Sequence, residues 1–229
     1  MKKILLLFVC LFVCWALFAQ QRIKVACVGN SITYGTGLAD RATQSYPVQL
    51  QKLLGEHYEV ENFGKPGATL LNQGHRPYTR QEEYRKALDF AGDIVVIHLG
   101  INDTDPRDWP NYRDSFVTDY LNLMDTFRKA NPDVRIIIAR MTPIADRHNR
   151  FLSGTRDWHG EMQTAIETVA HYAGVQLIDF REPLYPYPFL LPDAVHPTAE
   201  GAAIMAKTVY SAITGDYGGL KLSPLYMDN

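Results

Sequence analysis

Residues 24–33 read Lys-Val-Ala-Cys-Val-Gly-Asn-Ser-Ile-Thr, and this stretch decides the fold. A short apolar run without polar alternation is typical of a strand that is buried on both faces of a parallel sheet. The run ends at Gly29, and Ser31 follows two residues later. Because ligands bind at the carboxyl ends of strands in open α/β sheets, Ser31 is expected to be a nucleophile or a residue that caps the next helix.

Working outward from this stretch, the chain alternates between two patterns. Short apolar runs, mostly rich in Val and Ile, predict strands at residues 23–28, 58–62, 93–99, 134–139 and 176–178. Helical spacing of apolar residues predicts helices at residues 46–54, 81–90, 112–130, 157–172 and 198–212. The alternation predicts an α/β fold with a parallel sheet between two helical layers, that is, a three-layer α/β/α sandwich.

Length and composition fit one soluble domain. The chain has 229 residues, of which 46% are hydrophobic and 21% charged. Its formal net charge of -2 and the lack of a basic run give no electrostatic case for a nucleic-acid partner. We expect a single domain over residues 21–229, whose last part, 213–229, forms a C-terminal tail of unassigned role.

The first twenty residues predict a signal peptide. Lys2 and Lys3 precede an almost unbroken apolar run over residues 4–18, and Ala19 is a small residue suited to cleavage. The run is shorter than the roughly 20 residues that a membrane-spanning helix needs. The protein is therefore expected to be exported, periplasmic or secreted, without stable membrane insertion after cleavage. Cys27 then remains as the single cysteine, expected to be a small buried residue.

Two more polar segments follow predicted strands. Gly67 lies shortly after the second strand, where its backbone N–H could lie beside Ser31 or simply form a Pro-Gly turn. Asn102 follows the third strand. Its uncharged N–H₂ group suits the stabilisation of an oxyanion, although an Asx turn is the alternative.

A fourth segment carries a carboxylate and an imidazole. Asp193 and His196 are three residues apart, directly before Pro197, which suits the first turn of the last predicted helix. Asp193 could orient Nδ1 of His196 and leave Nε2 free for Ser31; a surface histidine near a helix start is the alternative. None of the other six histidines has an acidic residue at this spacing near the carboxyl end.

Each segment is a weak signal alone, but their order is informative. Residues 23–212 resemble the SGNH (GDSL-type) hydrolase family, whose four blocks carry Ser, Gly, Asn and His in this order. One departure is Asn30, because the family usually has Asp before the serine. Asn keeps a side chain that can hydrogen-bond in the turn. The α/β-hydrolase motif Gly-x-Ser-x-Gly is not formed around Ser31, because Thr33 replaces its second glycine.

The resemblance implies a flavodoxin-like sandwich with five parallel strands. It also implies Ser31 as the nucleophile, His196 as the base and Asp193 as the residue that orients this base. The oxyanion hole would consist of the Ser31 and Gly67 N–H groups and the Asn102 side chain. Neither a cofactor nor a metal ion is expected.

The substrate hypothesis is an O-acetyl ester on a carbohydrate, because the chain resembles exported carbohydrate (sialate-type) O-acetylesterases. Loops near the expected active-site mouth combine aromatic rings with polar groups, which suits a sugar better than an acyl chain. Arg76, Trp109 and Trp158 are candidate substrate-binding residues. The alternatives are a lysophospholipase or thioesterase, a catalytically inactive carbohydrate-binding protein, and a flavodoxin-type FMN binder with its phosphate loop at residues 31–37.

Overall fold

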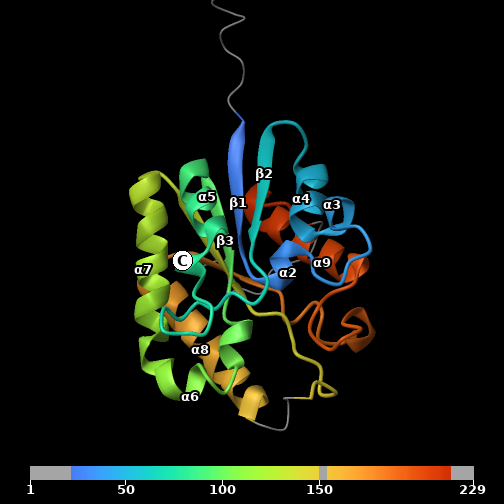
Figure 1. Ribbon diagram of the computed structural model, residues 1–229. Coiled ribbons are helices and arrows are strands. Elements are labelled where there is room, and N and C mark those ends of the chain that lie inside the picture. The colour runs from blue at the N-terminus through green and yellow to red at the C-terminus, as the bar shows by residue number, and fades with distance from the viewer. Residues whose placement is uncertain (1–21, 150–153, 218–229) are drawn as a thin grey trace, which may run out of the picture.

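One sheet of five parallel strands forms the centre of the molecule, in the order β2-β1-β3-β4-β5 (Figure 1). The computed structural model describes residues 22–149 and 154–217, so the expected signal peptide lies outside the described residues. The strands are β1 (Ile23–Gly29), β2 (Tyr58–Gly64), β3 (Ile94–His98), β4 (Arg135–Arg140) and β5 (Gln176–Asp179). This arrangement confirms the flavodoxin-like fold that the sequence predicts.

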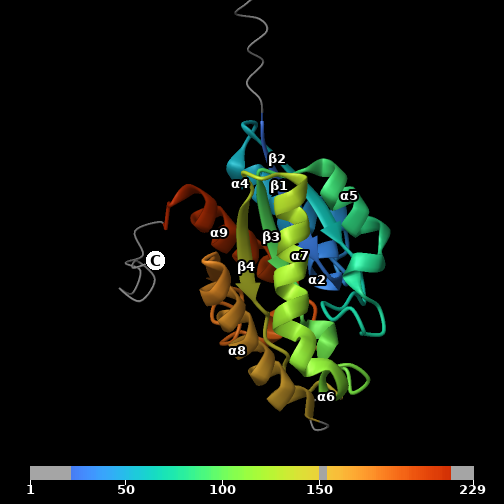
Figure 2. The same ribbon diagram turned by 90° about the vertical axis from the view of Figure 1, so that its left-hand side faces the viewer.

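Helices cover both faces of the sheet. Figures 1 and 2 show α5, α7 and α8 on one face and α4 and α9, which pack against each other, on the opposite face. Their bounds are α4 (Tyr46–Leu54), α5 (Glu82–Phe90), α7 (Phe116–Ala130), α8 (Arg156–Ala173) and α9 (Ala199–Thr214). The three-layer prediction is confirmed.

The central strands are buried on both faces, as their uninterrupted apolar sequences predict. All five residues of β3 are buried, and so are the last five residues of β1. Cys27 has no exposed surface, and burial raises the pKa of its thiol to about 12. It is therefore a small core residue, as expected. Gly29 pairs with Gly64 and His98, which places the end of β1 between the ends of β2 and β3.

Two helices, α7 and α9, differ from the predicted bounds by more than one residue at one end. The helix expected to begin at Tyr112 is divided into α6 (Trp109–Tyr112), a 3₁₀ turn and α7, which begins at Phe116, the first residue of the apolar periodicity. α9 continues to Thr214 and ends at Gly215, which has a φ of 74°. The left-handed conformation at Gly215 ends the helix.

Several short elements connect the strand ends. They are α2 (Ser31–Tyr34), α3 (Arg41–Gln44) and 3₁₀ turns at Tyr78–Arg80, Ile101–Thr104, Arg113–Ser115 and Pro188–Leu190. Within residues 22–149 and 154–217, no helix has the length and apolar character needed to cross a membrane. The same residues contain no group of three or more His, Cys, Asp or Glu side chains placed to hold a metal ion.

Candidate active site

Ser31 is the first residue of α2, at the carboxyl end of β1. The side chain that caps this helix belongs to Asn30, whose Oδ1 accepts a hydrogen bond of 3.0 Å from the Ile32 N–H. Asn30 thus keeps the turn together, as expected for the residue that replaces the family's Asp. The Ser31 hydroxyl is not used as the cap and can contact other groups.

Gly29 is required because two groups approach it closely. A Cβ atom at this position would lie 2.1 Å from Oγ1 of Thr33 and 2.8 Å from the carbonyl oxygen of His98. Gly29 does not have a positive φ. Its absent side chain, rather than an unusual backbone conformation, therefore lets α2 begin directly after β1.

Ser31, His196 and Asp193 form a chain of contacts. Nε2 of His196 lies 2.8 Å from Oγ of Ser31, and Nδ1 lies 2.5 Å from Oδ2 of Asp193. A carboxylate only accepts hydrogen bonds, so Nδ1 carries the proton and Nε2 can accept the proton of the Ser31 hydroxyl. The structure therefore brings together the three residues expected to be catalytic.

Asp193 is held in its ionised form. Partial burial by itself raises the pKa of this carboxyl, but hydrogen bonds from the backbone N–H and the imidazole of His196, and from Val195 N–H, lower the pKa below its ordinary value. The backbone bond from His196 is 2.7 Å long. A stably charged Asp193 remains an acceptor for the Nδ1 proton of His196.

The loop that carries Asp193 and His196 is fixed by its backbone. The Ala194 carbonyl accepts a 2.8 Å hydrogen bond from Ala145 N–H, in the segment after β4. The helix cap that follows is Thr198, whose Oγ1 accepts from Gly201 N–H at 3.2 Å. Pro197 therefore lies before the cap of α9 and not in its first turn, which corrects the prediction from sequence.

The two backbone N–H groups expected in the oxyanion hole have no acceptor among the described residues. In the part of the chain that the structure describes, neither Ser31 N–H nor Gly67 N–H donates a hydrogen bond. Ser31 is 7% exposed, and its N–H lies in the first helical turn, where a helix offers no internal acceptor. Buried backbone donors almost always have an acceptor, so a ligand oxygen is a fitting partner.

Asn102 lies in the 3₁₀ turn after β3. Its Nδ2 donates one hydrogen bond of 2.9 Å to the Ala68 carbonyl oxygen, next to Gly67. This bond connects the two segments that were expected to form the oxyanion hole. Because the N–H₂ group has two hydrogens, the second one is free for an oxyanion. Gly67 has a φ of 77°, which favours glycine at this position.

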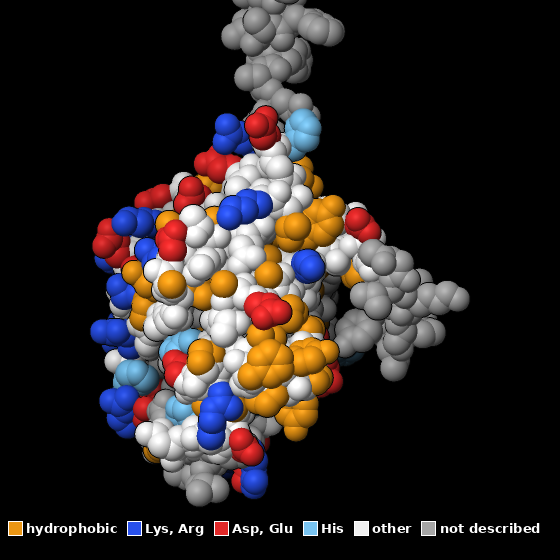
Figure 3. Space-filling model, turned by 90° about the vertical axis from the view of Figure 1, so that its right-hand side faces the viewer, with side chains coloured by type: hydrophobic (Ala, Val, Ile, Leu, Met, Phe, Trp, Pro, Cys, Tyr) orange, Lys and Arg blue, Asp and Glu red, His pale blue; other side chains and the backbone are white. Residues whose placement is uncertain are grey.

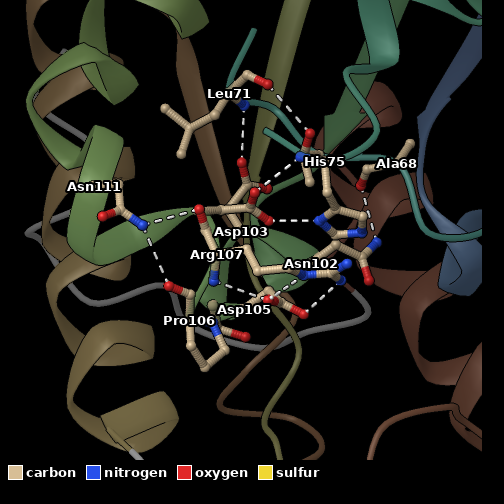
Figure 4. Close-up of polar contacts among 12 residues, drawn as sticks. Ala68, Leu71, His75, Asn102, Asp103, Asp105, Pro106, Arg107 and Asn111 are labelled. Carbon is tan, nitrogen blue, oxygen red and sulfur yellow. Dashed lines mark hydrogen bonds and ion pairs between the residues drawn. The ribbon is translucent and has the colours of Figure 1, made fainter. Parts of the chain in front are cut away.

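Two aspartate side chains that follow β3 in the chain accept hydrogen bonds from the loop after Gly67. These contacts were not predicted from the sequence. The buried Asp103 accepts hydrogen bonds from the N–H groups of Leu70 (2.9 Å) and Leu71 (2.8 Å) (Figure 4). Burial raises the pKa of Asp103 to about 7, although these hydrogen bonds lower it. Asp119 similarly accepts from the N–H and the side chain of Asn72. The motif that contains Asn102 also contains Asp103, and this adjacency was the available signal.

The three candidate substrate-binding residues have different surroundings. Arg76 is exposed and donates to the Pro66 carbonyl oxygen at 3.0 Å, which places it directly against Gly67. Trp109 is only 3% exposed, and its Nε1 donates to Glu161 at 2.7 Å. Its ring packs inside the protein because Phe116 contacts it edge-on, so it has no open face for a sugar. Trp158 is half-buried and packs against the core.

Other aromatic and polar side chains are divided between buried and exposed positions. Tyr78 and His159 are buried, and both use their polar atoms within the protein. Three aromatic side chains in the segment before Asp193 are exposed: Tyr185, Tyr187 and Phe189. The face shown in Figure 3 carries a group of hydrophobic side chains in its lower part. A cavity of about 380 Å³ borders Tyr185 and His159 but not Ser31.

Comparisons with known proteins agree with this geometry. A model described as the GDSL-like Lipase/Acylhydrolase family matches residues 27–204. An acetylxylan esterase of Xylanibacter ruminicola is 33% identical over 215 residues, which cover 85% of this chain and 44% of that protein. The chain thus spans less than half the length of this relative.

Solved structures show the same fold. The acetyl xylan esterase AlAXEase superposes with a TM-score of 0.65 at 22% identity, covering 83% of this chain and 100% of that one. A carbohydrate acetylesterase family member from Sinorhizobium meliloti gives a TM-score of 0.64 at 20% identity, covering 83% and 96%. At these identities, the likeness concerns the arrangement of the strands and helices.

Proposed function

Because the chain belongs to the GDSL-like lipase/acylhydrolase (SGNH) family, we propose that it is a serine esterase that removes small acyl groups, above all O-acetyl groups, from carbohydrate. The observation that carries this proposal is the contact of 2.8 Å between Ser31 and His196, with Asp193 on the other nitrogen of the ring. A nucleophile, a base and an orienting carboxylate are the parts that acyl transfer through a serine requires.

In the acylation step, Nε2 of His196 takes the proton from Ser31 while Oγ attacks the carbonyl carbon of the ester. The resulting imidazolium is stabilised by Asp193, which stays ionised. The tetrahedral intermediate then collapses, the bond to the sugar oxygen breaks, and His196 gives its proton to this oxygen. The products of the step are a free sugar hydroxyl and an acetyl ester on Ser31.

In the deacylation step, water takes the place of the sugar. His196 accepts a proton from the water as its oxygen attacks the acetyl carbonyl, and returns a proton to Oγ when the intermediate collapses. Acetate leaves and Ser31 is restored. In both steps the negative oxygen would be bound by the N–H groups of Ser31 and Gly67 and by Nδ2 of Asn102. Such fixed donors stabilise the charge at little reorganisation cost.

Two observations support a carbohydrate as the alcohol part of the ester. The 33% identical relative is named an acetylxylan esterase, which favours an acetylated xylan or a similar glycan. In addition, Tyr185, Tyr187 and Phe189 are exposed on the segment that leads to Asp193. Exposed aromatic rings can stack on the flat faces of sugar rings. Arg76, next to Gly67, would meet a polar or acidic group of the glycan.

Export of the protein remains part of the proposal. It is carried by residues 1–20 alone, with their two lysines followed by an apolar run. Expression of the full chain in a bacterial host tests it. We expect the protein in the periplasm or medium, with an N-terminus near residue 21, whereas uncleaved protein in the cytoplasm would contradict export.

The chemical proposal is tested by the choice of ester. We expect acetate release from acetylated xylan oligosaccharides and a kcat/KM for p-nitrophenyl esters that decreases from acetate to octanoate. A lysophospholipase or thioesterase would prefer the longer chain, so a higher kcat/KM on octanoate would contradict the proposal. A catalytically inactive carbohydrate-binding protein would release no acetate and would leave Ser31 unlabelled by a fluorophosphonate.

A further inference from the structure

A second histidine–aspartate pair, His75 and Asp108, lies outside the proposed catalytic machinery. Nδ1 of His75 is 2.6 Å from Oδ2 of Asp108, and the backbone N–H of His75 donates to Oδ1 of the same carboxylate at 2.8 Å. His196 contacts Asp193 in the same two ways, through its backbone N–H and through Nδ1. The arrangement that orients the proposed catalytic base therefore occurs twice in this chain.

The aspartate of the second pair is more deeply buried than that of the first. The side chain of Asp108 is 1% exposed, whereas that of Asp193 is 54% exposed. The side chain of His75 is 27% exposed. A carboxylate with so little access to water holds its hydrogen-bond partner firmly. The imidazole of His75 is thus fixed in one orientation, with its other edge toward the surface.

The contact with Asp108 determines the hydrogen-bonding character of that edge. Because the carboxylate only accepts, Nδ1 of neutral His75 carries the proton, and Nε2 presents a lone pair. Among the described residues, Nε2 of His75 has no hydrogen-bond partner. A hydroxyl group of a ligand, which can donate a proton to this lone pair, is the matching chemistry.

The pair belongs to loops that are hydrogen-bonded to the segments of the proposed oxyanion hole. Residues next to His75 run along the Gly67 loop, since Thr69 N–H donates to the Arg76 carbonyl oxygen at 2.9 Å and the Arg76 side chain lies against Gly67. Figure 4 shows the two loops joined, with Asn102 bound to Ala68 and His75 bound to the residues after β3. The loop that carries His75 is therefore joined both to the Gly67 segment and to the segment that carries Asn102.

We propose that Nε2 of His75 accepts a hydrogen bond from a free sugar hydroxyl beside the acetyl ester, which makes His75 a specificity-determining residue for partly acetylated glycans. The inference rests on the proposed esterase function. A sugar acetate differs from a simple acetate in having a neighbouring hydroxyl group. Asp108 is then a positioning residue that acts through His75.

The test compares two substrates in two proteins. The substrates are a xyloside monoacetate with a free hydroxyl on the carbon next to the ester, and the same compound with that hydroxyl replaced by hydrogen. We expect the replacement to lower kcat/KM about tenfold in the wild type, as the loss of one hydrogen bond of about 1.4 kcal/mol would. In His75→Ala, which already lacks the acceptor, the replacement should cost less than about twofold.

This double comparison remains valid if His75→Ala weakens the fold, because each protein is compared with itself. His57→Ala is the matched control, since His57 is an exposed histidine at the opposite end of the sheet, directly before β2. It should show the same tenfold difference as the wild type. An equal cost of the deoxy replacement in wild type and His75→Ala would overturn the inference alone.

A second readout distinguishes recognition from a structural role. We expect His75→Ala to lower the ratio of kcat/KM for the xyloside to that for p-nitrophenyl acetate about tenfold, mainly through KM. An equal decrease on both esters would mean that the pair only shapes the oxyanion hole, and would overturn the inference. If the wild type released no acetate from the xyloside, the proposed function would fail, and this inference with it.

Discussion

Nε2 of His196 lies 2.8 Å from Oγ of Ser31, within hydrogen-bonding distance and with its lone pair available to the hydroxyl proton. The two residues are 165 positions apart in the chain, Ser31 at the start of α2 after β1 and His196 in the loop before α9. The contact depends on Asp193, which fixes the imidazole. The proposed reaction also needs the oxyanion donors that we assign to Gly67 and Asn102. Each of these dependences can be measured.

Asp193→Asn should lower kcat by about 10²–10⁴-fold with little change in KM. An Asn side chain can donate to Nδ1 of His196, which favours the tautomer with a proton on Nε2. This tautomer cannot accept the Ser31 proton. Steady-state kinetics on p-nitrophenyl acetate measure the effect. A variant with wild-type kcat would show that Asp193 does not orient the base.

Asn102→Ala should lower kcat by about 10²–10³-fold, equivalent to roughly 3–4 kcal/mol of transition-state stabilisation. The variant removes one donor for the oxyanion and also the hydrogen bond to Ala68. A far-ultraviolet circular dichroism spectrum and a melting curve verify that the fold is retained. If kcat fell less than about twofold in a folded variant, Asn102 would have no part in the oxyanion hole.

Asp103→Asn tests the buried carboxyl that holds the Gly67 loop. Burial raises the pKa of Asp103 to about 7 in the folded state, above its ordinary value of 3.8. A raised pKa means that its contribution to stability is fully present below the ordinary value and is lost as the pH rises through about 7. The free energy of unfolding should therefore fall more steeply between pH 5 and pH 8 in the wild type than in the variant. Urea unfolding at several pH values gives these slopes, and parallel slopes would contradict the assignment.

His159→Gln should reduce the loss of stability in acid. Burial lowers the pKa of His159 to about 4, although its hydrogen bond to Thr142 raises it. A lowered pKa means that the stabilising contribution is present above the ordinary value of 6.5 and disappears as the pH falls toward 4. Glutamine can still donate to the Thr142 carbonyl but does not titrate. The wild type should thus lose more unfolding free energy between pH 6.5 and pH 4 than the variant, and an equal loss would contradict a neutral His159.

Much of the fold follows from the sequence because its elements have strong periodic signals. α4 has the predicted bounds, and the buried strands β1 and β3 were visible as uninterrupted apolar runs. The four-residue helices α2 and α6 were not predicted, since one helical turn is too short to show a hydrophobic period. Their ends depend on caps and on tertiary contacts instead.

Some features of the candidate site could also be predicted from the sequence, and others could not. The carboxyl ends of parallel strands lie at the same edge of a sheet. Ser31 and His196 could therefore be placed together from the order of their segments in the chain. The burial of Trp109 and the pairing of His75 with Asp108 were not predictable, because both depend on how the long loops fold back on the sheet. Nothing in the local sequence distinguishes a buried aspartate such as Asp108 from one on the surface.

The most direct measurement of the central claim is acetate release from acetylated xylan oligosaccharides by the wild type and by Ser31→Ala. We expect release by the wild type and a loss of several orders of magnitude in kcat for Ser31→Ala, with a melting temperature that changes by less than about 2 °C. A folded Ser31→Ala variant that releases acetate at the wild-type rate would contradict the account.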